Sequence, residues 1–321
     1  MNEFFEVPPD FTGEVRLDTY IAKTLGILNR SQIKTRKLTA SINGGAVKLS
    51  RPVRAGDRLE LSWQNEADEY LVPENIPLRI IFEDGNCVVM NKAQGMVVHP
   101  GAGNKSGTLA NALAYRRRLR RGAGDTDLRE GPRTGIVHRL DKDTSGVIIA
   151  AYTGEALAFL AAQFRARAVD KRYLALVRGV PALERGKIEG LIARKAADRR
   201  RFCLVPSAAA DARVFSGAAR GRYSFTFYRV VKKWNAYSLL LLIPKTGRTH
   251  QLRVHLKSIG CPILGDPLYG RSDKNFPGAG LMLHAWRLSI TVPGAAAPSC
   301  FTAPLPLRFK RIVDALDAVV K

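Results

Sequence analysis

GIVHRLDKDTSGVIIAA, residues 135–151, places a cluster of charged side chains between two apolar segments. The pair Ile136–Val137 predicts a short lead-in strand, and the continuous apolar run 147–151 predicts a strand buried on both faces. Between them, residues 143–146 are types that favour turns. Charges held between buried strands cost free energy unless they are paired or used. The stretch is therefore either a salt-bridged turn or part of a functional site.

The composition favours a globular protein that binds a polyanion. The chain has 321 residues, enough for one large domain or two unequal ones. Its formal net charge of +23 favours contact with nucleic acid through steering and counterion release. A solvated basic surface without a nucleic-acid partner is the alternative.

Several classes of protein find no support in the sequence. The first residues, MNEFFEVPPDF, lack the pattern of a secretory signal, and no apolar run approaches 18 residues, so we expect no membrane partner. The four cysteines are single and the five histidines dispersed, which argues against disulfides and metal sites and fits a reducing cytoplasm. No glycine-rich nucleotide motif is present, so we expect neither a cofactor nor a metal. We also expect the protein to be a monomer.

Residues 14–63 predict a small α+β unit. Apolar residues at helical spacing in 16–25 predict one helix. A second short helix should open at Asn29 or Ser31. Asn43-Gly44 predicts a hairpin turn, and 53–63 predict a turn followed by a strand. The second helix carries the basic residues of the unit that we select as RNA-binding candidates: Arg30, Lys34, Arg36 and Lys37.

The order of these pieces resembles the alpha-L RNA-binding domain, the type found in ribosomal protein S-four. The matching segments are RLD at 16–18, RSQI at 30–33, NG at 43–44 and VRAGD at 53–57. The resemblance implies that the basic second helix and the hairpin face RNA phosphates.

The remaining chain predicts a larger α+β domain with a mostly antiparallel sheet. An acidic segment, 64–76, reads as a linker or surface strap. Residues 116–133 and 187–215 are arginine-rich without clear periodicity, and 116–133 should be a solvated loop or an RNA-facing strap. Regular elements are expected from their apolar spacing: strands within 80–90, 171–179, 223–228 and 237–243, and helices from Thr153 to about Arg167, at 249–259 and at 307–320.

The stretch 135–151 carries one of several motifs in this sequence that are typical of one protein family. Its segment HRLDKDTSG resembles the signature of the RluA family of pseudouridine synthases. Further segments match the family in the same order: NKAQGMVVHPG (91–101), KRYLALVRG (171–179), KTGRTHQLRVHL (245–256), GCPILGDPLYG (260–270), LHAWRL (283–288) and TAPLP (302–306). One departure is Ala93, which stands where most relatives have proline, so that loop should be less rigid.

The resemblance covers nearly the whole chain and implies an enzyme that isomerises uridine in RNA. It implies residues 1–70 as an alpha-L RNA-binding domain with linker and 71–321 as the catalytic domain. The extra RNA-binding domain and the high charge favour large-subunit ribosomal RNA as the substrate, with transfer RNA as the alternative. No cofactor or metal is required by this reaction.

The resemblance also assigns residues. Asp141 matches the essential aspartate, Tyr173 the tyrosine that stacks on the uracil, and Arg253 the basic residue that pairs with the aspartate. Arg139 matches the arginine that fills the space left by the flipped nucleotide. Whether the aspartate attacks C1′ or helps to remove a sugar proton stays open. Four neighbours of these residues are further candidates for RNA contact: His138, Arg248, His250 and Gln251. Arg248, His250 and Gln251 could brace the loop instead.

Two other classes of protein compete with this interpretation. A glycoside hydrolase needs two carboxylates at a fixed distance across the sugar bond, and Asp141 and Asp143 lie only two residues apart in a turn. A non-catalytic RNA-binding or ribosome-assembly protein would be expected to lack Asp141 or Tyr173, and both are present.

Overall fold

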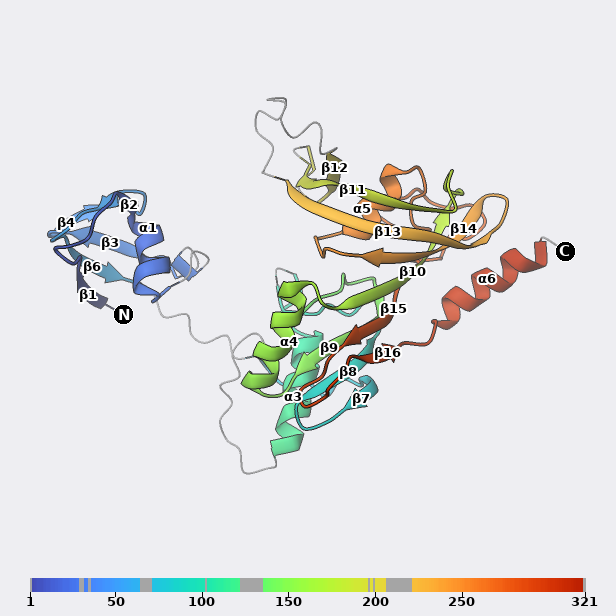
Figure 1. Ribbon diagram of the computed structural model, residues 1–321, viewed down its shortest axis with the longest axis horizontal. Coiled ribbons are helices and arrows are strands. Elements are labelled where there is room, and N and C mark those ends of the chain that lie inside the picture. Colours follow the sequence, from blue (N-terminus) through green and yellow to red (C-terminus); the bar gives the residue numbers. More distant parts are fainter. Residues whose placement is uncertain are drawn as a thin grey trace. The chain divides into compact units, whose positions relative to one another are not determined.

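The computed structural model describes residues 2–28, 32–33, 36–63, 71–101, 103–121, 135–195, 197–198, 200–205 and 221–319. The chain divides into two compact units, Met1–Tyr70 and Leu71–Lys321 (Figure 1).

The first unit is built around a four-stranded sheet in the order β1-β6-β3-β4. Its helical part is a short α1 (Leu17–Tyr20) that runs on as a π-helix, η1 (Ile21–Leu25). Leu17, Tyr20 and Ile21 are buried against the sheet residues Leu59 and Leu61. The strands are β1 (Asn2–Glu6), β2 (Val15–Arg16), β3 (Thr39–Ile42), β4 (Gly45–Val47), β5 (Pro52–Val53) and β6 (Arg58–Ser62), with β2 paired to β5.

The hairpin expected at Asn43-Gly44 is confirmed. Both residues have positive φ, 52° and 79°, which is the two-residue turn that matches the twist of antiparallel strands. The expected basic helix is only partly described, because Arg30 and Lys34 lie outside the described residues. Within the described part, Gln32 and Ile33 are helical, whereas Arg36 and Lys37 form a turn in which Lys37 has φ 49°.

Residues 14–63 are basic, with ten Lys or Arg and four Asp or Glu, but acidic residues in 1–13 and 64–70 cancel this charge over the whole first unit. Residues 1–70 hold ten Lys or Arg and ten Asp or Glu, whereas residues 71–321 hold 41 and 18. The entire net charge of +23 therefore lies in the second unit.

The second unit contains one large sheet, in the order β12-β11-β13-β14-β10-β15-β9-β8-β7, with β16 paired to β15. Among the described strands of this sheet, only β15 and β9 pair in parallel, so the expectation of a mostly antiparallel α+β fold is confirmed. The strands are β7 (Arg79–Glu83), β8 (Cys87–Lys92), β9 (Ser145–Ala151), β10 (Asp170–Arg178), β11 (Arg185–Arg194), β12 (Phe202–Val205), β13 (Arg222–Lys233), β14 (Tyr237–Pro244), β15 (Leu283–Ile290) and β16 (Ser299–Thr302).

In the described part of the unit, four helices pack on this sheet: α3 (Leu109–Arg121), α4 (Gly154–Ala166), α5 (Gln251–Ser258) and α6 (Leu307–Val319). Helices α3 and α4 cover opposite faces of β8 and β9, since Leu113 packs with Ile148 and Leu160 packs with Ile149. Every residue of β9 is buried, as the apolar run predicted. Helices α5 and α6 pack on β10 and β14 in the other half of the sheet (Figure 1).

Several local predictions are confirmed. The side chain of Thr153 accepts a hydrogen bond from the Ala156 amide at 3.1 Å and caps α4, and Arg167, the residue after the helix, has a left-handed conformation. The strands at β7, β8, β10, β13 and β14 and the helices α5 and α6 lie where the sequence predicts them.

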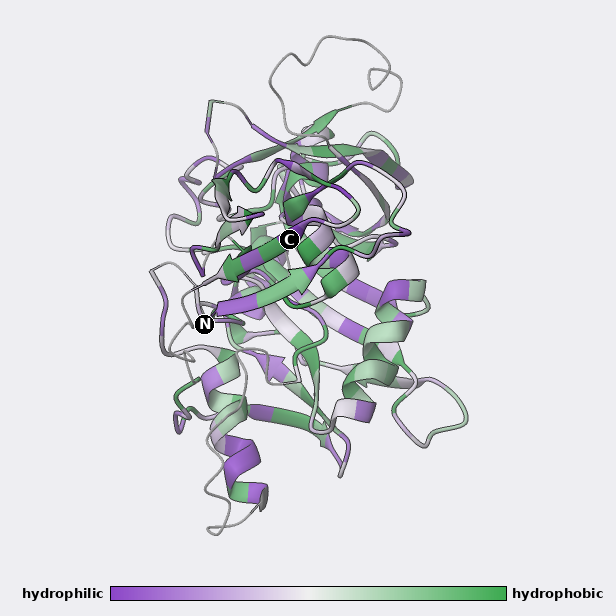
Figure 2. Cartoon of the chain, turned by 90° about the vertical axis from the view of Figure 1, so that its left-hand side faces the viewer, coloured by the Kyte–Doolittle hydropathy of each residue, from purple (hydrophilic) through white to green (hydrophobic). Residues whose placement is uncertain are grey.

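Two local predictions are wrong. Residues 116–121 are not loop but the end of α3, whose apolar first half and arginine-rich second half are visible in Figure 2. The rest of the predicted segment 116–133 lies outside the described residues. The described part of 187–215, for which the sequence predicts no element, contains most of β11 and all of β12. Ile136–Val137 is not a strand, because only an isolated bridge joins Ile136 to Ala150.

No helix among the described residues has the length and apolar character needed to cross a membrane.

Candidate active site

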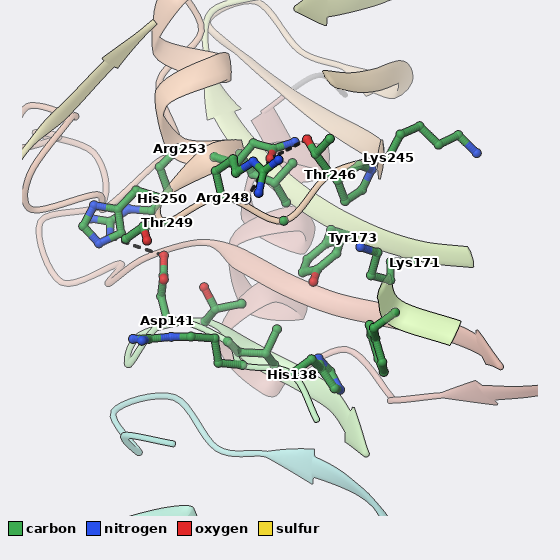
Figure 3. A pocket seen from close by; sticks show the side chains of 18 of the residues that line it. His138, Asp141, Lys171, Tyr173, Lys245, Thr246, Arg248, Thr249, His250 and Arg253 are labelled. Carbon is green, nitrogen blue, oxygen red and sulfur yellow. Dashed lines mark hydrogen bonds and ion pairs between the residues drawn. The ribbon is translucent and has the colours of Figure 1, made fainter. Parts of the chain in front are cut away.

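A cavity of about 480 Å³ lies where the two halves of the large sheet meet. Asp141, Tyr173 and Arg253 all line it, although 112 residues separate the first from the last. Figure 3 shows Asp141 reaching from the loop before β9 toward Arg253 and His250, which belong to the opposite wall. The three predicted catalytic side chains therefore share one pocket.

Glycines bracket the loop that carries Asp141. Gly135 and Gly146 both have positive φ, 67° and 119°. A Cβ on Gly135 would collide with the carbonyl of Ala151, and one on Gly146 with the carbonyl of Ala285. The loop thus leaves and re-enters the sheet at two points where only glycine fits.

The loop after β8 clamps the turn that contains Asp141. The buried Nζ of Lys92 donates to the carbonyls of Ala93, Met96 and Lys142 at 2.8, 2.9 and 3.0 Å. The amide of Gly95 donates to the same Lys142 carbonyl at 2.9 Å. Burial lowers the pKa of Lys92 to about 8, although the charges of Asp143 and Asp141 favour its protonated form.

Arg253 stands beside Asp141 but is held by Asp266. Its Nε and Nη2 donate to the two carboxylate oxygens of Asp266 at 2.8 and 2.7 Å, and its Nη1 lies 3.6 Å from Asp141 Oδ2. Burial opposes the charge of Arg253, but the bonds to Asp266 and the charge of Asp141 outweigh it and raise the pKa of Arg253. A fixed positive charge therefore faces Asp141.

Tyr173 lies on β10, and its ring faces the pocket. Burial, with a smaller contribution from the negative charge of Asp141, raises the pKa of Tyr173 above its ordinary value, so the phenol stays neutral. A neutral aromatic ring next to a carboxylate can stack on a base without adding a second negative charge.

His250 is a non-glycine residue in the left-handed region, with φ 56° and ψ 19°. Such a residue is held there by its surroundings. His250 Nδ1 lies 2.9 Å from the hydroxyl of Tyr269, and its ring packs edge-on against Phe202. These contacts place the imidazole at the pocket, and burial lowers its pKa.

Gln251 braces the loop before α5. It is only 4% exposed, and its Oε1 accepts from Thr246 Oγ1 and from the Arg248 amide at 2.8 and 3.0 Å. Its Nε2 donates to the Phe225 carbonyl and to Thr226 Oγ1. The amide thus uses both donors and accepts twice, which favours the bracing role over RNA contact.

Arg248 lines the pocket from the same loop. Its Nε donates to the Tyr223 carbonyl at 3.0 Å. The side chain is therefore tied to β13 through one nitrogen. The other guanidinium nitrogens of Arg248 form no hydrogen bond or ion pair with any described residue, so RNA contact stays a prediction for this residue.

His138 and Arg139 occupy different environments. His138 Nε2 accepts from the Ile149 amide at 3.0 Å, and its ring stacks on Phe164. Burial and the charge of Lys171 lower the pKa of His138 to about 3, so the ring is neutral and acts as part of the packing. Arg139 is exposed at the pocket, where a side chain that enters RNA would need to be.

The sequence predicts no role for Lys92, Lys171 or Asp266. Each lies inside a quoted family segment, NKAQG, KRYLALVRG or GDPLYG, but the local pattern gives no sign of its partner. Lys171 lines the pocket, and burial together with Arg167 and Lys245 lowers its pKa. Nowhere in the described part of the chain do three His, Cys, Asp or Glu side chains gather as metal ligands would.

Comparison with known proteins identifies the family of this chain. Residues 86–258 match the family model described as RNA pseudouridylate synthase. Ribosomal large subunit pseudouridine synthase D of Borreliella burgdorferi is 41% identical over 302 residues, which cover 92% of this chain and 87% of that protein. The protein of the same name from Nitrosomonas europaea is 37% identical over 319 residues, covering 96% of this chain and 86% of that protein.

Solved structures give the same result. Human RNA pseudouridylate synthase domain containing 4 aligns with a TM-score of 0.59 and 26% identity, covering 74% of this chain and 93% of that one. Human RNA pseudouridylate synthase domain containing 1 aligns with a TM-score of 0.55 and 27% identity, covering 76% and 96%. The chain therefore belongs to the RluA family of RNA pseudouridine synthases, enzymes that isomerise uridine to pseudouridine.

Proposed function

We propose that this enzyme isomerises specific uridines of large-subunit ribosomal RNA and that Asp141 is its reactive carboxylate. The observation that carries the proposal is the position of Asp141, which shares a pocket with Tyr173 and lies 3.6 Å from the fixed guanidinium of Arg253. Relatives named ribosomal large subunit pseudouridine synthase D match over both units of the chain, which supports the choice of RNA.

The reaction breaks the N1–C1′ bond of uridine, turns the uracil and bonds C5 to C1′. A carboxylate can serve only in its ionised form, as nucleophile or as base, and a fixed cation favours that form. Arg253 supplies the cation, and Asp266 prevents it from closing fully onto Asp141. Asp141 thus keeps oxygen lone pairs available for the sugar.

The uridine must leave the stacked RNA before it can reach this pocket. In our proposal Tyr173 stacks on the uracil and Arg139 fills the space that the nucleotide leaves. His250 and Arg248 contact the RNA around the target, while His138 and Gln251 hold the loops in place through the internal bonds described above.

The proposal for the first unit is an alpha-L RNA-binding domain that contributes to target choice. Because the first unit has no net charge, the non-specific attraction of RNA would come from the second unit, which carries the excess of Lys and Arg. The first unit would then recognise a local RNA shape through Arg30, Lys34, Arg36 and Lys37. The proposal also includes a cytoplasmic, monomeric enzyme.

Release of tritium from RNA labelled at uridine C5 tests the activity, because C5 loses its hydrogen when it bonds to C1′. Unmodified large-subunit ribosomal RNA and bulk transfer RNA should be compared as substrates at equal uridine concentration. We expect release from the ribosomal RNA alone. Release from transfer RNA alone would refute the proposed substrate but not the proposed chemistry.

A further inference from the structure

A second cavity lies at the opposite end of α5 from the catalytic pocket. It is open, has a volume of about 1070 Å³ and is formed by the end of β10, the end of α5 and the segment 268–275. None of the described residues that line it also lines the catalytic pocket. The cavity is therefore a separate feature of the catalytic unit.

Positive charge dominates the lining of this cavity. Five cationic residues contribute to it: Arg178, Arg201, Lys257, Arg271 and Lys274. The one carboxylate in the lining, Asp273, is 5% exposed and pairs with Arg178 at 3.1 Å. Asp273 also accepts from the hydroxyl of Tyr237 and from backbone amides, so its charge is already used internally.

Three of the cations remain uncompensated. Lys257, Arg271 and Lys274 are exposed, and none of them forms an ion pair with any described residue. Converging cations without counter-charges raise the local potential and favour an anionic ligand. Their side chains also supply several donors of the kind that phosphate oxygens accept.

Tyr269 connects the cavity with the catalytic pocket. The ammonium of Lys257 lies 5.9 Å from the centre of the Tyr269 ring, and the guanidinium of Arg253 lies 5.1 Å from it. The Tyr269 hydroxyl bonds to His250, which lines the catalytic pocket. The two sites are therefore joined through the contacts of Tyr269.

The separation of the two sites suits a single RNA strand. Tyr173 and Arg178 lie on the same strand, β10, and five residues of strand span roughly 17 Å. At about 3.4 Å per stacked nucleotide, that distance corresponds to about five nucleotides.

We propose that this cavity is a phosphodiester-binding subsite that holds the RNA backbone about five nucleotides from the target uridine. The proposal rests on the proposed function, since the same RNA fills both sites. Contacts to phosphate carry no sequence information, but they fix the position of the strand and supply affinity. The subsite would therefore hold the RNA strand while the uridine reacts in the catalytic pocket.

The double variant Arg271→Gln/Lys274→Gln tests the subsite in the full-length protein. The matched control, Lys310→Gln/Arg311→Gln, removes the same charge from exposed positions on α6. The probe is a fluorescein-labelled single-stranded transcript that carries one uridine with ten nucleotides on each side. Affinity is measured by anisotropy from low to high salt.

We expect the subsite variant to bind the transcript about tenfold more weakly than the wild type. The slope of log affinity against log salt should be smaller by about 1.4, which corresponds to the loss of two phosphate contacts on a single strand. The control should keep the wild-type slope within about 0.5. A transcript cut to two nucleotides on each side should bind the subsite variant and the wild type equally. Equal losses in the two variants, or an undiminished difference on the short transcript, would overturn the subsite.

Tritium release by the wild type is measured in parallel. If the wild type releases none, the proposed function fails, whereas the binding comparison still decides the subsite. If the wild type releases tritium and the subsite variant binds as the control does, only the subsite is refuted.

Discussion

Arg253 and Asp266 form a two-pronged ion pair, with N–O distances of 2.8 and 2.7 Å, that turns the remaining nitrogen of Arg253 toward Asp141. Asp266 is itself fixed, because it accepts hydrogen bonds from the amides of Leu268 and Tyr269. The cation next to the reactive carboxylate is therefore positioned from behind, by a residue that does not line the pocket.

Replacing Asp266 by Asn should loosen Arg253 and let it move toward Asp141. A displacement of about 1 Å at a reacting group costs on the order of 100-fold in rate, so we expect that loss in single-turnover tritium release. Because the buried Arg253 also loses its counter-charge, the free energy of unfolding should fall by about 3 kcal/mol. Urea unfolding measures this loss.

Glu83→Gln is the matched control for Asp266→Asn. Glu83 pairs with Arg116 and Arg120 on α3, away from the catalytic pocket. Its loss should weaken the packing of α3 and leave single-turnover release at the wild-type rate. Equal losses of rate in the two variants would mean that Asp266 acts through stability alone.

Asp141→Asn should reduce tritium release by about 10⁴-fold or more, because an amide is neither a nucleophile nor a base of comparable strength. RNA affinity should change little, since the substitution preserves the shape of the side chain. Asp143→Asn, two residues along the same turn, is the control and should retain release. A variant of Asp141 that loses RNA affinity as strongly as activity would make this carboxylate structural.

The apolar parts of the fold were predictable from local pattern. The strand at 147–151 and the helix capped by Thr153 follow from burial on both faces and from a side-chain cap, which are local properties. The second half of α3 was not predictable, because its arginines find distant partners. Arg116 bonds to Glu83, and Arg120 lies over the ring of Tyr152.

Strand β11 was hidden by its position near the edge of the sheet. Its buried residues, Ile188 and Ile192, alternate with exposed charges such as Lys187 and Glu189, and the glycine at 190 interrupts the apolar series. A strand covered on one side offers half the apolar signal of β9. The segment that forms β11 therefore has no apolar pattern from which a strand could be predicted.

The residues of the catalytic site were also predictable only in part. The resemblance to a family indicated Asp141, Tyr173 and Arg253, and the structure places them in one pocket. The supports of these residues were not predictable, since Lys92 meets the carbonyl of Lys142 across 50 positions of sequence. Such contacts depend on the packing of the loops and leave no local pattern.

Lys92 makes activity sensitive to alkaline pH. In the folded protein its pKa is about 8 instead of 10.5, so it loses its proton as the pH rises through 8. A neutral amine has two hydrogens for three carbonyls, and the turn with Asp141 should loosen. We expect single-turnover release to fall between pH 7.5 and 9.5.

The stability of the fold should change in the opposite direction over that range. Between pH 8 and 10.5 the unfolded chain binds the Lys92 proton and the folded chain does not, so this residue adds stability as the pH rises. Lys92→Met should have low activity without the alkaline decline. The same decline in Lys92→Met would assign it to another group.

Two buried histidines, His255 and His284, should make the fold sensitive to mild acid. Both are fully buried, and burial lowers the pKa of each to about 4 from 6.5. As the pH falls below 6.5, the unfolded chain takes up protons that the folded chain refuses, so stability decreases. At pH 5.5 each of the two should remove about 1.4 kcal/mol relative to pH 7.5. His138, with a pKa of about 3, acts in the same direction, so the three histidines together should remove about 4 kcal/mol. Urea unfolding at the two pH values measures this difference.

His255→Gln separates this effect from that of other groups. Gln can replace the bond that His255 makes to Ser224 Oγ at 2.9 Å, but it does not titrate. The variant should lose about 1.4 kcal/mol less than the wild type between pH 7.5 and 5.5, whatever its stability at the higher pH. The acidic groups with lowered pKa values, Glu83 at about 2 and Asp266, titrate below this range and cannot produce the difference. An equal decrease in variant and wild type would show that His255 is already protonated in the folded enzyme.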